Sequence, residues 1–377
     1  METPFTFGKI VFGLNFANRT DEINQLITNF KSGINCILLS PRRWGKSSLV
    51  LKATEKIKQK NKKVRVVHID LYNIRSEEEF YKTYTESVLK ATSSKLEEAI
   101  SHLKTFLKHW SPKISFSADD QNEYKIGLEW QELKKEPDEI IDLPENIAAS
   151  KKLKIIICID EFQNIGFFGD PLGFQKKLRS HWQKHQSAVY CLYGSKRHML
   201  IDVFASSSMP FYKFGDLIFL DKISEDEWIK YIVRRFRSTG KTISGKNAAL
   251  IARLVECHPY YVQQLAQLCW FRSQPEASEQ IVDKSFESLM LQLSLLFQGM
   301  VGSLPNTQIN FLKALIDKVE QLSSKETIAK YKLGTSAGVL QVKKALVNKE
   351  IIDDSGEKIF ILDPVFSAWL KRFYFQE

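Results

Sequence analysis

Short apolar runs alternate with helical patterns over the first 221 residues of the chain. Several runs are apolar at almost every position, which is typical of parallel strands buried on both faces. Strands that alternate with helices predict a right-handed, doubly wound α/β layer. We expect strands at 34–39, 64–72, 154–161, 188–195 and 216–223, and helices at 47–58, 77–110 and 173–184.

A different pattern interrupts this layer between 111 and 146. The stretch KISFSADDQNEYKIGLEW alternates polar and apolar residues around a polar turn, which predicts an inserted β-hairpin. The charged segment 131–144 follows it, and we expect this segment to be exposed.

From Ser224 the pattern is helical up to about 298, without a strand signal. Three helical segments follow from 303, and IIDDSGEKIFILD then reads as two short strands around an Asp-Ser-Gly turn. This order predicts a winged helix-turn-helix. The sequence therefore predicts three domains: an α/β core over 1–221, a helical lid over 222–300 and a winged helix over 301–377.

Composition narrows the class of protein. The 377 residues are 44% hydrophobic and 26% charged, so a disordered chain is excluded. No apolar run reaches the length of about 18 residues that a membrane helix needs, and the first residues do not resemble a secretory signal. Five cysteines form no CxxC pair, which predicts reduced thiols in a cytoplasmic protein. The net charge of +10 is spread along the chain, and its one dense basic run, at 56–63, is explained better by a solvated helix end than by a nucleic-acid patch.

The loop SPRRWGKSS, at 40–48, carries the main chemical signal. It lies between a strand and a helix and ends in the Gly-Lys-Ser of a phosphate-binding loop, in which backbone N–H groups and the helix N-terminus surround phosphates. Lys46 would reach the terminal phosphates and the Ser47 hydroxyl would ligate magnesium, while Ser40 stands where the motif has its first glycine. The expected nucleotide-binding residues of the loop are Pro41, Arg42, Arg43, Trp44, Gly45, Lys46, Ser47 and Ser48.

A second signal is the buried strand IIICIDEF, which ends in two acids. We expect it next to the loop strand, with Asp160 holding Mg²⁺ through water or through the coordination shell of Ser47. Glu161 would orient or deprotonate the attacking water. Ser195 ends the strand AVYCLYGS, beside the acidic strand, where a γ-phosphate sensor would lie. Taken singly, each feature is also explained by a helix start, an acidic turn or a Gly-Ser turn.

Four blocks together resemble the archaeal-type P-loop ATPase family, which is allied to AAA+ proteins and to the MNS-like clade of the STAND NTPases. They are NFANRTDEINQL, SPRRWGKSSL, IIICIDEFQNI and HPYYVQQLAQ, and the C-terminal LDPVFSAWLKRF resembles the end of the family's winged helix. The resemblance implies a P-loop NTPase fold, ATP and Mg²⁺ as ligands, and catalytic roles for Lys46, Glu161 and Ser195.

The resemblance also implies contacts to the base and ribose. Phe16 and Arg19 would lie near the adenine or its ribose, and Pro259 would present the lid helix to the base. Asn18 and Cys257 stand where the family has glycine, as Ser40 does. These three replacements are expected to affect the rate of ATP hydrolysis more than the binding of ATP.

We expect an ATP-binding and ATP-hydrolysing switch that couples its nucleotide state to a protein partner or to a homo-oligomer. Two alternatives stay open. One is a DNA-binding regulator that uses the winged helix, in which Lys343, Lys344 and Lys349 supply the basic residues. The other is an ATP-binding scaffold with negligible turnover. No membrane contact is expected.

Overall fold

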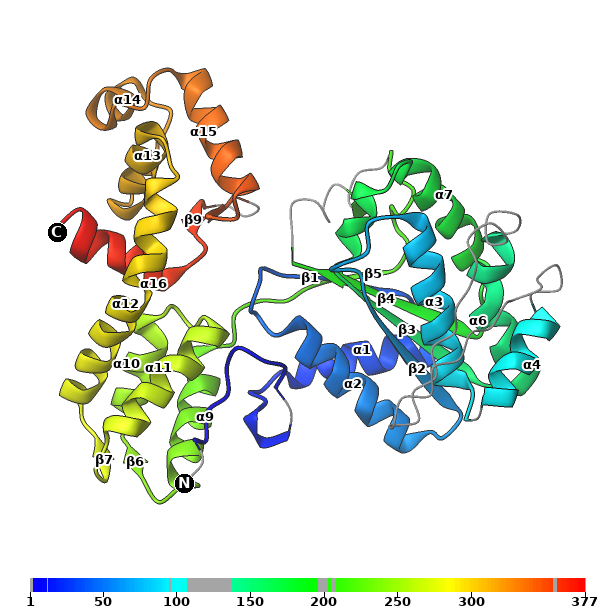
Figure 1. Cartoon of the computed structure of the whole chain (residues 1–377). Coiled ribbons are helices and arrows are strands. Elements are labelled where there is room, and N and C mark those ends of the chain that lie inside the picture. The colour runs from blue at the N-terminus through cyan, green and yellow to red at the C-terminus, as the bar shows by residue number, and fades with distance from the viewer. Residues whose placement is uncertain are drawn as a thin grey trace. The chain divides into compact units, whose positions relative to one another are not determined.

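A computed structural model describes residues 3–11, 13–94, 96–106, 137–195, 203–204, 208–354 and 358–376. The chain forms two compact units (Figure 1). Arg19–Asp221 make one, which we call the α/β unit. Met1–Asn18 and Lys222–Glu377 make the other, which we call the helical unit.

The α/β unit is built on a five-stranded sheet in the order β2-β3-β4-β1-β5, with every neighbouring pair parallel. Its central strands are buried throughout, as their apolar runs require. The expected α/β fold with a parallel sheet is confirmed. The strands are β1 (Cys36–Leu39), β2 (Val64–Asp70), β3 (Lys154–Asp160), β4 (Ala188–Gly194) and β5 (Asp216–Phe219).

The sheet order corrects one expectation. The acidic strand β3 is not next to the loop strand β1, because β4 lies between them and pairs with both. All seven residues of β4 are buried, which suits a strand with a neighbour on each edge. Ser195 therefore follows a strand inserted between the phosphate loop and the acidic residues, and β4 is beside β3 as expected.

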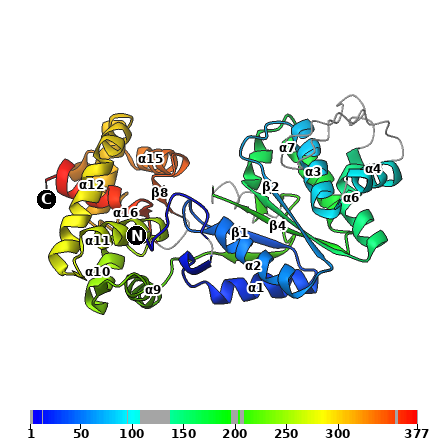
Figure 2. The same cartoon turned by 60° about the horizontal axis from the view of Figure 1, so that its bottom comes forward.

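Helices cover both faces of this sheet (Figure 2). Helices α1 (Thr20–Ser32) and α2 (Lys46–Lys60) lie on one face. The other face carries α3 (Glu77–Thr92), α6 (Pro137–Lys151) and α7 (Pro171–Trp182), whose apolar residues form one core with the strands, and α4 (Leu96–Phe106) packs against α6.

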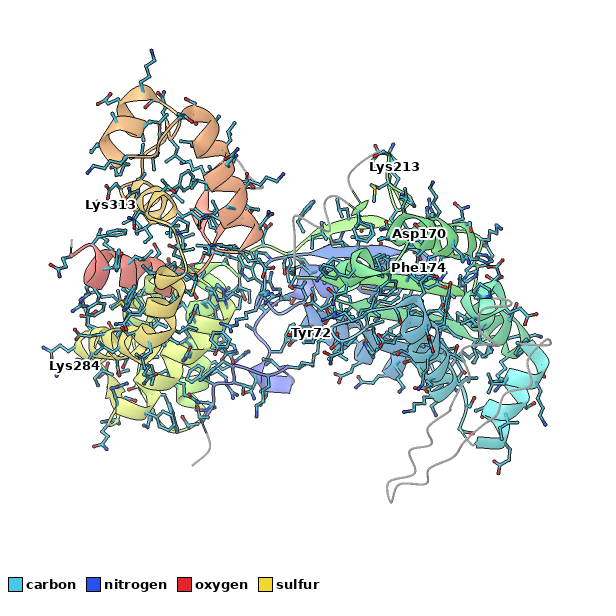
Figure 3. The ribbon with its side chains drawn as sticks, turned by 45° about the horizontal axis from the view of Figure 1, so that its top comes forward. Tyr72, Asp170, Phe174, Lys213, Lys284 and Lys313 are labelled. Atoms are coloured by element: carbon cyan, nitrogen blue, oxygen red, sulfur yellow. The ribbon has the colours of Figure 1, made fainter. Side chains whose placement is uncertain are left out.

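Aromatic rings fill the core under α7. Asp170 begins the helix by accepting a hydrogen bond from the backbone N–H of Gly173, and Phe174 is buried one turn further on (Figure 3). The ring of Phe174 packs edge-on against Phe80 of α3, with centroids 5.1 Å apart. This layer also holds Phe162, which begins the 3-10 helix η2 (Phe162–Phe167) after β3.

The predicted hairpin lies largely outside the described residues, which resume at 137. From there the chain is helical, and Ile140, Ile141, Leu143 and Pro144 of α6 are buried. The expectation that the segment up to 144 is exposed is therefore wrong for this part. Its apolar residues belong to the core beneath α3 and α7, and Asp142 bonds His181 of α7 and His185, so a charged residue of this segment also contacts the unit.

In the helical unit, four helices follow Ser224, which caps the first one as expected. A pair of two-residue parallel strands, which the sequence pattern did not predict, connects two of the loops. The elements are α9 (Glu225–Arg237), β6 (Thr242–Ile243), α10 (Gly245–Leu254), α11 (Pro259–Arg272), β7 (Glu276–Ala277) and α12 (Glu279–Gly302).

The last part has the expected order of three helices and an antiparallel strand pair, followed by a short helical end. It shares one apolar core with the preceding helices, and Phe297 of α12 packs against Phe366 with centroids 5.2 Å apart. The predicted Asp-Ser-Gly turn falls mostly outside the described residues. The elements are α13 (Asn306–Ile316), α14 (Lys325–Tyr331), α15 (Ser336–Asn348), β8 (Ile352–Asp353), β9 (Phe360–Ile361), α16 (Pro364–Trp369) and the helical turn η3 (Leu370–Tyr374).

The N-terminal segment packs on the helical unit, although the sequence analysis assigned it to the α/β core. Phe5 is buried against Phe236 of α9, and the backbone carbonyl oxygen of Pro4 accepts a hydrogen bond from Arg235. The short 3-10 helix η1 (Gly13–Asn15) ends in a carbonyl oxygen that accepts from the Tyr231 hydroxyl at 2.9 Å. In the part of the chain that the structure describes, we find no helix with the length and apolar character to cross a bilayer.

Candidate functional site

The loop between β1 and α2 places a lysine inside a curve of backbone. Gly45 has φ +92° and Arg43 has φ +63°, so the left-handed conformation occurs at these two residues. Ser40 is buried and does not have a positive φ, so the missing glycine is not required for the turn itself. The loop bends at Arg43 and Gly45 instead.

Lys46 is buried, with 6% of its surface exposed, and its ammonium group is held by the loop. Nζ donates to the carbonyl oxygens of Ser40 at 3.0 Å and of Pro41 at 2.9 Å, and to Ser40 Oγ at 3.3 Å. A phosphate that binds here would exchange these acceptors for stronger, charged ones. Ser40 thus supplies an oxygen that a glycine at this position would lack.

Ser47, in the first turn of α2, meets the end of β3. Its Oγ donates to Oδ2 of Asp160 at 2.7 Å, and the backbone N–H of Glu161 donates to Oδ1 at 2.8 Å. Burial raises the pKa of Asp160 to about 6, and the hydrogen bonds from Ser47 and Glu161 oppose that rise. A hydroxyl and one carboxylate suit Mg²⁺, which takes few protein ligands when substrate phosphates supply others.

Glu161 lies at the centre of a chain of polar side chains. It has φ +51° and ψ +39°, a conformation that costs a non-glycine residue about 1–3 kcal/mol and that is common at functional sites. Ser195 Oγ donates to Glu161 Oε2 at 3.0 Å, and Arg42 Nε donates to Ser195 Oγ at 3.3 Å. The structure therefore brings the phosphate loop, the acidic strand end and the predicted sensor together.

A glutamine that the sequence analysis did not single out belongs to this chain. Gln163, at 1% exposure, donates through Nε2 to the same Oε2 of Glu161. The signal in the sequence was available, because IDEFQNIGFF places a polar amide two residues after the acid, between Phe162 and the apolar residues that begin at Ile165.

The other residues expected at the site belong partly to the loop and partly to other segments. Arg43 is exposed, and Trp44 and Ser48 are buried. Arg19 is buried between Glu22, at 2.9 Å, and the carbonyl oxygen of Trp44, at 3.4 Å, and burial lowers the pKa of its guanidinium. Phe16 follows η1, and Pro259 is the first residue of α11, so both belong to the helical unit. Their contacts to a nucleotide stay predictions.

Comparison with known families decides the class of this site. Residues 16–265 match a family described as the ATPase domain predominantly from Archaea. The chain belongs to this archaeal ATPase family. The match spans the phosphate loop, the acidic strand and α11, and residues 295–372 match a second family, described as a probable winged helix domain. The expected resemblance is confirmed, and so is an ATPase domain followed by a winged helix.

Solved structures share the fold of this archaeal ATPase over nearly its whole length. A Walker-type ATPase of Pyrococcus abyssi has a TM-score of 0.65 at 16% identity, and 94% of this chain covers 96% of that one. The Aeropyrum pernix ORC2 protein, solved as ADPNP–ADP complexes, has a TM-score of 0.59 at 13% identity, with 97% and 96% covered. The Aeropyrum pernix ORC1 protein in complex with DNA has 0.50 at 11%, with 98% of each chain covered. No curated protein matches the chain.

Proposed function

We propose that the chain is a switch that binds ATP with Mg²⁺ at the Ser40–Ser48 loop and hydrolyses it, and that its nucleotide state changes its binding to a protein partner or to further copies of itself. The observation that carries the proposal is the 2.7 Å contact between Ser47 and Asp160. It joins the two halves of a phosphate and metal site that are 113 residues apart in the chain. The structural neighbour solved with ADPNP and ADP supports the choice of an adenine nucleotide.

Each residue of the site has a role in the proposed reaction. Backbone N–H groups of the loop and the Lys46 ammonium bind the phosphates, and Ser47 and Asp160 would hold Mg²⁺. The ion, when bound, neutralises charge on the phosphate oxygens. Glu161 takes a proton from water as the water oxygen attacks the γ-phosphorus, the bond to the β–γ bridging oxygen breaks, and ADP leaves. Ser195 would donate to the γ-phosphate or to Glu161.

The division into units supports a switch. The chain passes between them only twice, at Asn18–Arg19 and at Asp221–Lys222. Asn18 is held on the helical unit by a hydrogen bond to Glu227, and Arg19 is held on the α/β unit next to the phosphate loop. A change in the loop on nucleotide binding therefore acts directly beside one of the two passages.

Two substitutions test the proposal. Lys46→Ala should abolish ATP binding in calorimetry, whereas Lys60→Ala, at the exposed end of the same helix, should leave it unchanged. Glu161→Gln should bind ATP like the wild type and release phosphate about a hundredfold more slowly. Unchanged ATP affinity in Lys46→Ala would refute the site, and equal phosphate release by wild type and Glu161→Gln would indicate the scaffold alternative.

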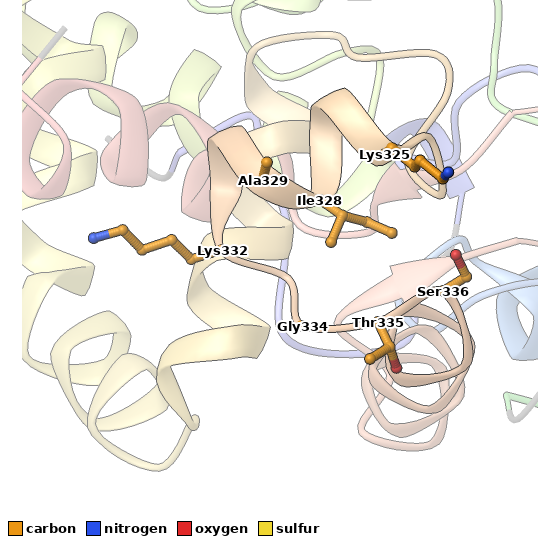
Figure 4. A pocket seen from close by; sticks show the side chains of 7 residues that line it. All are labelled: Lys325, Ile328, Ala329, Lys332, Gly334, Thr335 and Ser336. Carbon is orange, nitrogen blue, oxygen red and sulfur yellow. The ribbon is translucent and has the colours of Figure 1, made fainter.

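The winged helix offers a second candidate function, DNA binding. A cavity of about 600 Å³ opens between α14 and the start of α15 and is lined by Lys325, Ile328, Ala329, Lys332, Gly334, Thr335 and Ser336 (Figure 4). Of the lysines expected to bind DNA, Lys344 is exposed, but Lys343 is paired with Asp354 at 3.0 Å and Lys349 donates to Gln308 at 3.1 Å. Two of the three are therefore already held by neighbouring side chains, which favours a protein partner over DNA.

Duplex binding distinguishes these candidates. A DNA-binding winged helix should bind random duplex with a steep loss of affinity as salt rises, and Lys325→Glu with Lys332→Glu should remove that binding. If the protein does not bind duplex DNA, or binds it with an affinity that does not change with salt, the protein partner remains the proposal.

A further inference from the structure

Gln163 is the one member of the polar chain at Glu161 that neither the motif nor the proposed reaction uses. Its Nε2 and the Ser195 hydroxyl both donate to Oε2 of Glu161. Among the residues that the structure describes, Oε1 of Glu161 receives no hydrogen bond. The two oxygens of the carboxylate are therefore in different environments, one held by two donors and the other left as an acceptor.

The backbone around Gln163 is held firmly. Glu161 is in the left-handed conformation, and the next residue, Phe162, is fully buried against Phe211, with ring centroids 5.3 Å apart. Gln163 itself is 1% exposed, so the packed surroundings leave its amide little room to reorient while it holds the carboxylate of Glu161.

In the part of the chain that the structure describes, the buried amide oxygen of the same glutamine, Oε1, has no hydrogen-bond partner, and the same is true of that of Gln175 in α7. A buried acceptor without a partner destabilises the folded state, and an apolar side chain of similar shape would avoid this. What distinguishes Gln163 is that the other end of this amide donates to the acidic residue Glu161, and that contact points to a functional role.

We propose that Gln163 is a positioning residue for ATP hydrolysis, which holds Oε2 of Glu161 so that Oε1 is the atom that takes the proton from the attacking water. The inference rests on the proposed ATPase function and deepens it. As the proton moves to Oε1, the water oxygen bonds to the γ-phosphorus, and the bridging oxygen leaves with the electron pair of its broken bond. Gln163 itself neither gains nor loses a proton, and it contacts no phosphate.

Gln163→Met tests this role, because methionine keeps the length and volume of the side chain and cannot donate. Gln175→Met is the matched control. Gln175 lies in α7 of the same unit at 3% exposure, its Oε1 is also buried without a partner, and it makes no hydrogen bond to Glu161. Both variants remove an unsatisfied acceptor, but only one removes a donor to the proposed base.

Three measurements on the full chain are needed: phosphate release, ATP affinity by calorimetry, and the thermal midpoint of the ligand-free protein. Gln163→Met should lose tenfold or more in kcat and keep its ATP affinity, because a hydrogen bond to a charged group affects rates on this scale. Its unfolding temperature should stay close to that of the wild type, because removal of the unsatisfied acceptor offsets the loss of that hydrogen bond. Gln175→Met should keep its kcat and unfold at the same or a higher temperature.

Other outcomes overturn the inference separately from the proposed function. If Glu161→Gln loses its activity while Gln163→Met keeps the wild-type kcat, the ATPase site stands and the role of Gln163 is wrong. If Gln163→Met unfolds at a lower temperature and loses ATP affinity along with kcat, Gln163 is structural. A wild-type protein that binds ATP but releases no phosphate overturns both.

Discussion

The hydroxyl of Ser47 lies 2.7 Å from Oδ2 of Asp160, although a whole strand separates the strands that lead to these two residues. The contact is possible because Ser47 does not belong to β1 itself. It lies in the first turn of α2, after the loop that follows β1, and meets the end of β3, where the next residue, Glu161, bonds Ser195 at the end of β4. The site is therefore assembled across three neighbouring strand ends.

Ser47→Ala should weaken the dependence of ATP binding on magnesium. The wild type should bind ATP more tightly with Mg²⁺ than with EDTA, and the variant should lose about tenfold or more of that difference, because a metal ligand is gone while the backbone cradle remains. Calorimetry in both buffers gives the ratio. An unchanged ratio would remove Ser47 from the metal site.

In the absence of metal, the stability of the wild-type protein should depend on pH through Asp160. Asp160→Asn should remove this dependence. The pKa of Asp160 is raised in the folded state to about 6 from its usual value near 3.8, so the folded state binds the proton more tightly. The resulting stabilisation is fully present below about pH 4 and is lost as the pH rises through 6, an effect of about 3 kcal/mol in the free energy of unfolding. Urea unfolding in EDTA at pH 5 and at pH 8 measures about half of it, about 1.4 kcal/mol, because the stabilisation is already partly lost at pH 5.

The comparison of the two proteins isolates Asp160 from other titrating groups. Between pH 5 and pH 8 the wild type should lose more stability than Asp160→Asn. The same pH dependence in both proteins would show that Asp160 is not the group responsible.

Arg19→Ala should destabilise the α/β unit. The guanidinium is 5% exposed and bonds to Glu22 and to the carbonyl oxygen of Trp44, so its removal should cost about 1–3 kcal/mol in urea unfolding. Arg75→Ala, at an exposed position, is the control and should change stability by less than about 0.5 kcal/mol. If Arg19→Ala keeps its stability and loses only ATP affinity, the family-based assignment to the ribose is favoured over a structural role.

Cys257→Gly should be tolerated or stabilising, because Cys257 has φ +56°, a conformation that glycine adopts without strain, at a position where the family resemblance implies glycine. Relief of the left-handed strain, about 1–2 kcal/mol, outweighs the extra freedom that glycine gives the unfolded chain, about 0.5–1 kcal/mol. Cys269→Gly, fully buried inside α11, should instead lose stability through a cavity and a weaker helix. Thermal unfolding compares the two, and equal losses would contradict the prediction.

Asn18 and Ser40, the other two positions where glycine is replaced, behave differently. Neither has a positive φ: Asn18 uses its side chain to bond Glu227, and Ser40 uses its oxygens to hold Lys46. Of the three replacements, only the one at Cys257 therefore carries backbone strain. Sequence comparison alone treats the three positions as equivalent, because the letters do not reveal which residue the turn places in the left-handed region.

Much of the fold follows from local pattern. Buried parallel strands read as continuous apolar runs, so β1 to β4 were found from their composition, and α9 was found from Ser224 and the acids behind it. The segment 137–144 was misjudged because its charges are conspicuous and its buried residues are spaced for a helix that packs on α3 and α7. Whether such a helix is buried depends on partners distant in sequence.

By itself, the sequence determined which residues can do chemistry here: a lysine and a hydroxyl at a helix start, two acids at the end of a buried strand, and a polar residue at the end of the next one. Only the tertiary structure decided how they meet. Strand order depends on pairing between segments far apart in the chain, so the sequence did not reveal that β4 lies between β1 and β3. The same holds for the two hydrogen bonds that Ser195 and Gln163 donate to one oxygen of Glu161, and for the left-handed backbone at Cys257. These features appear only when the sheet and its helices are packed together.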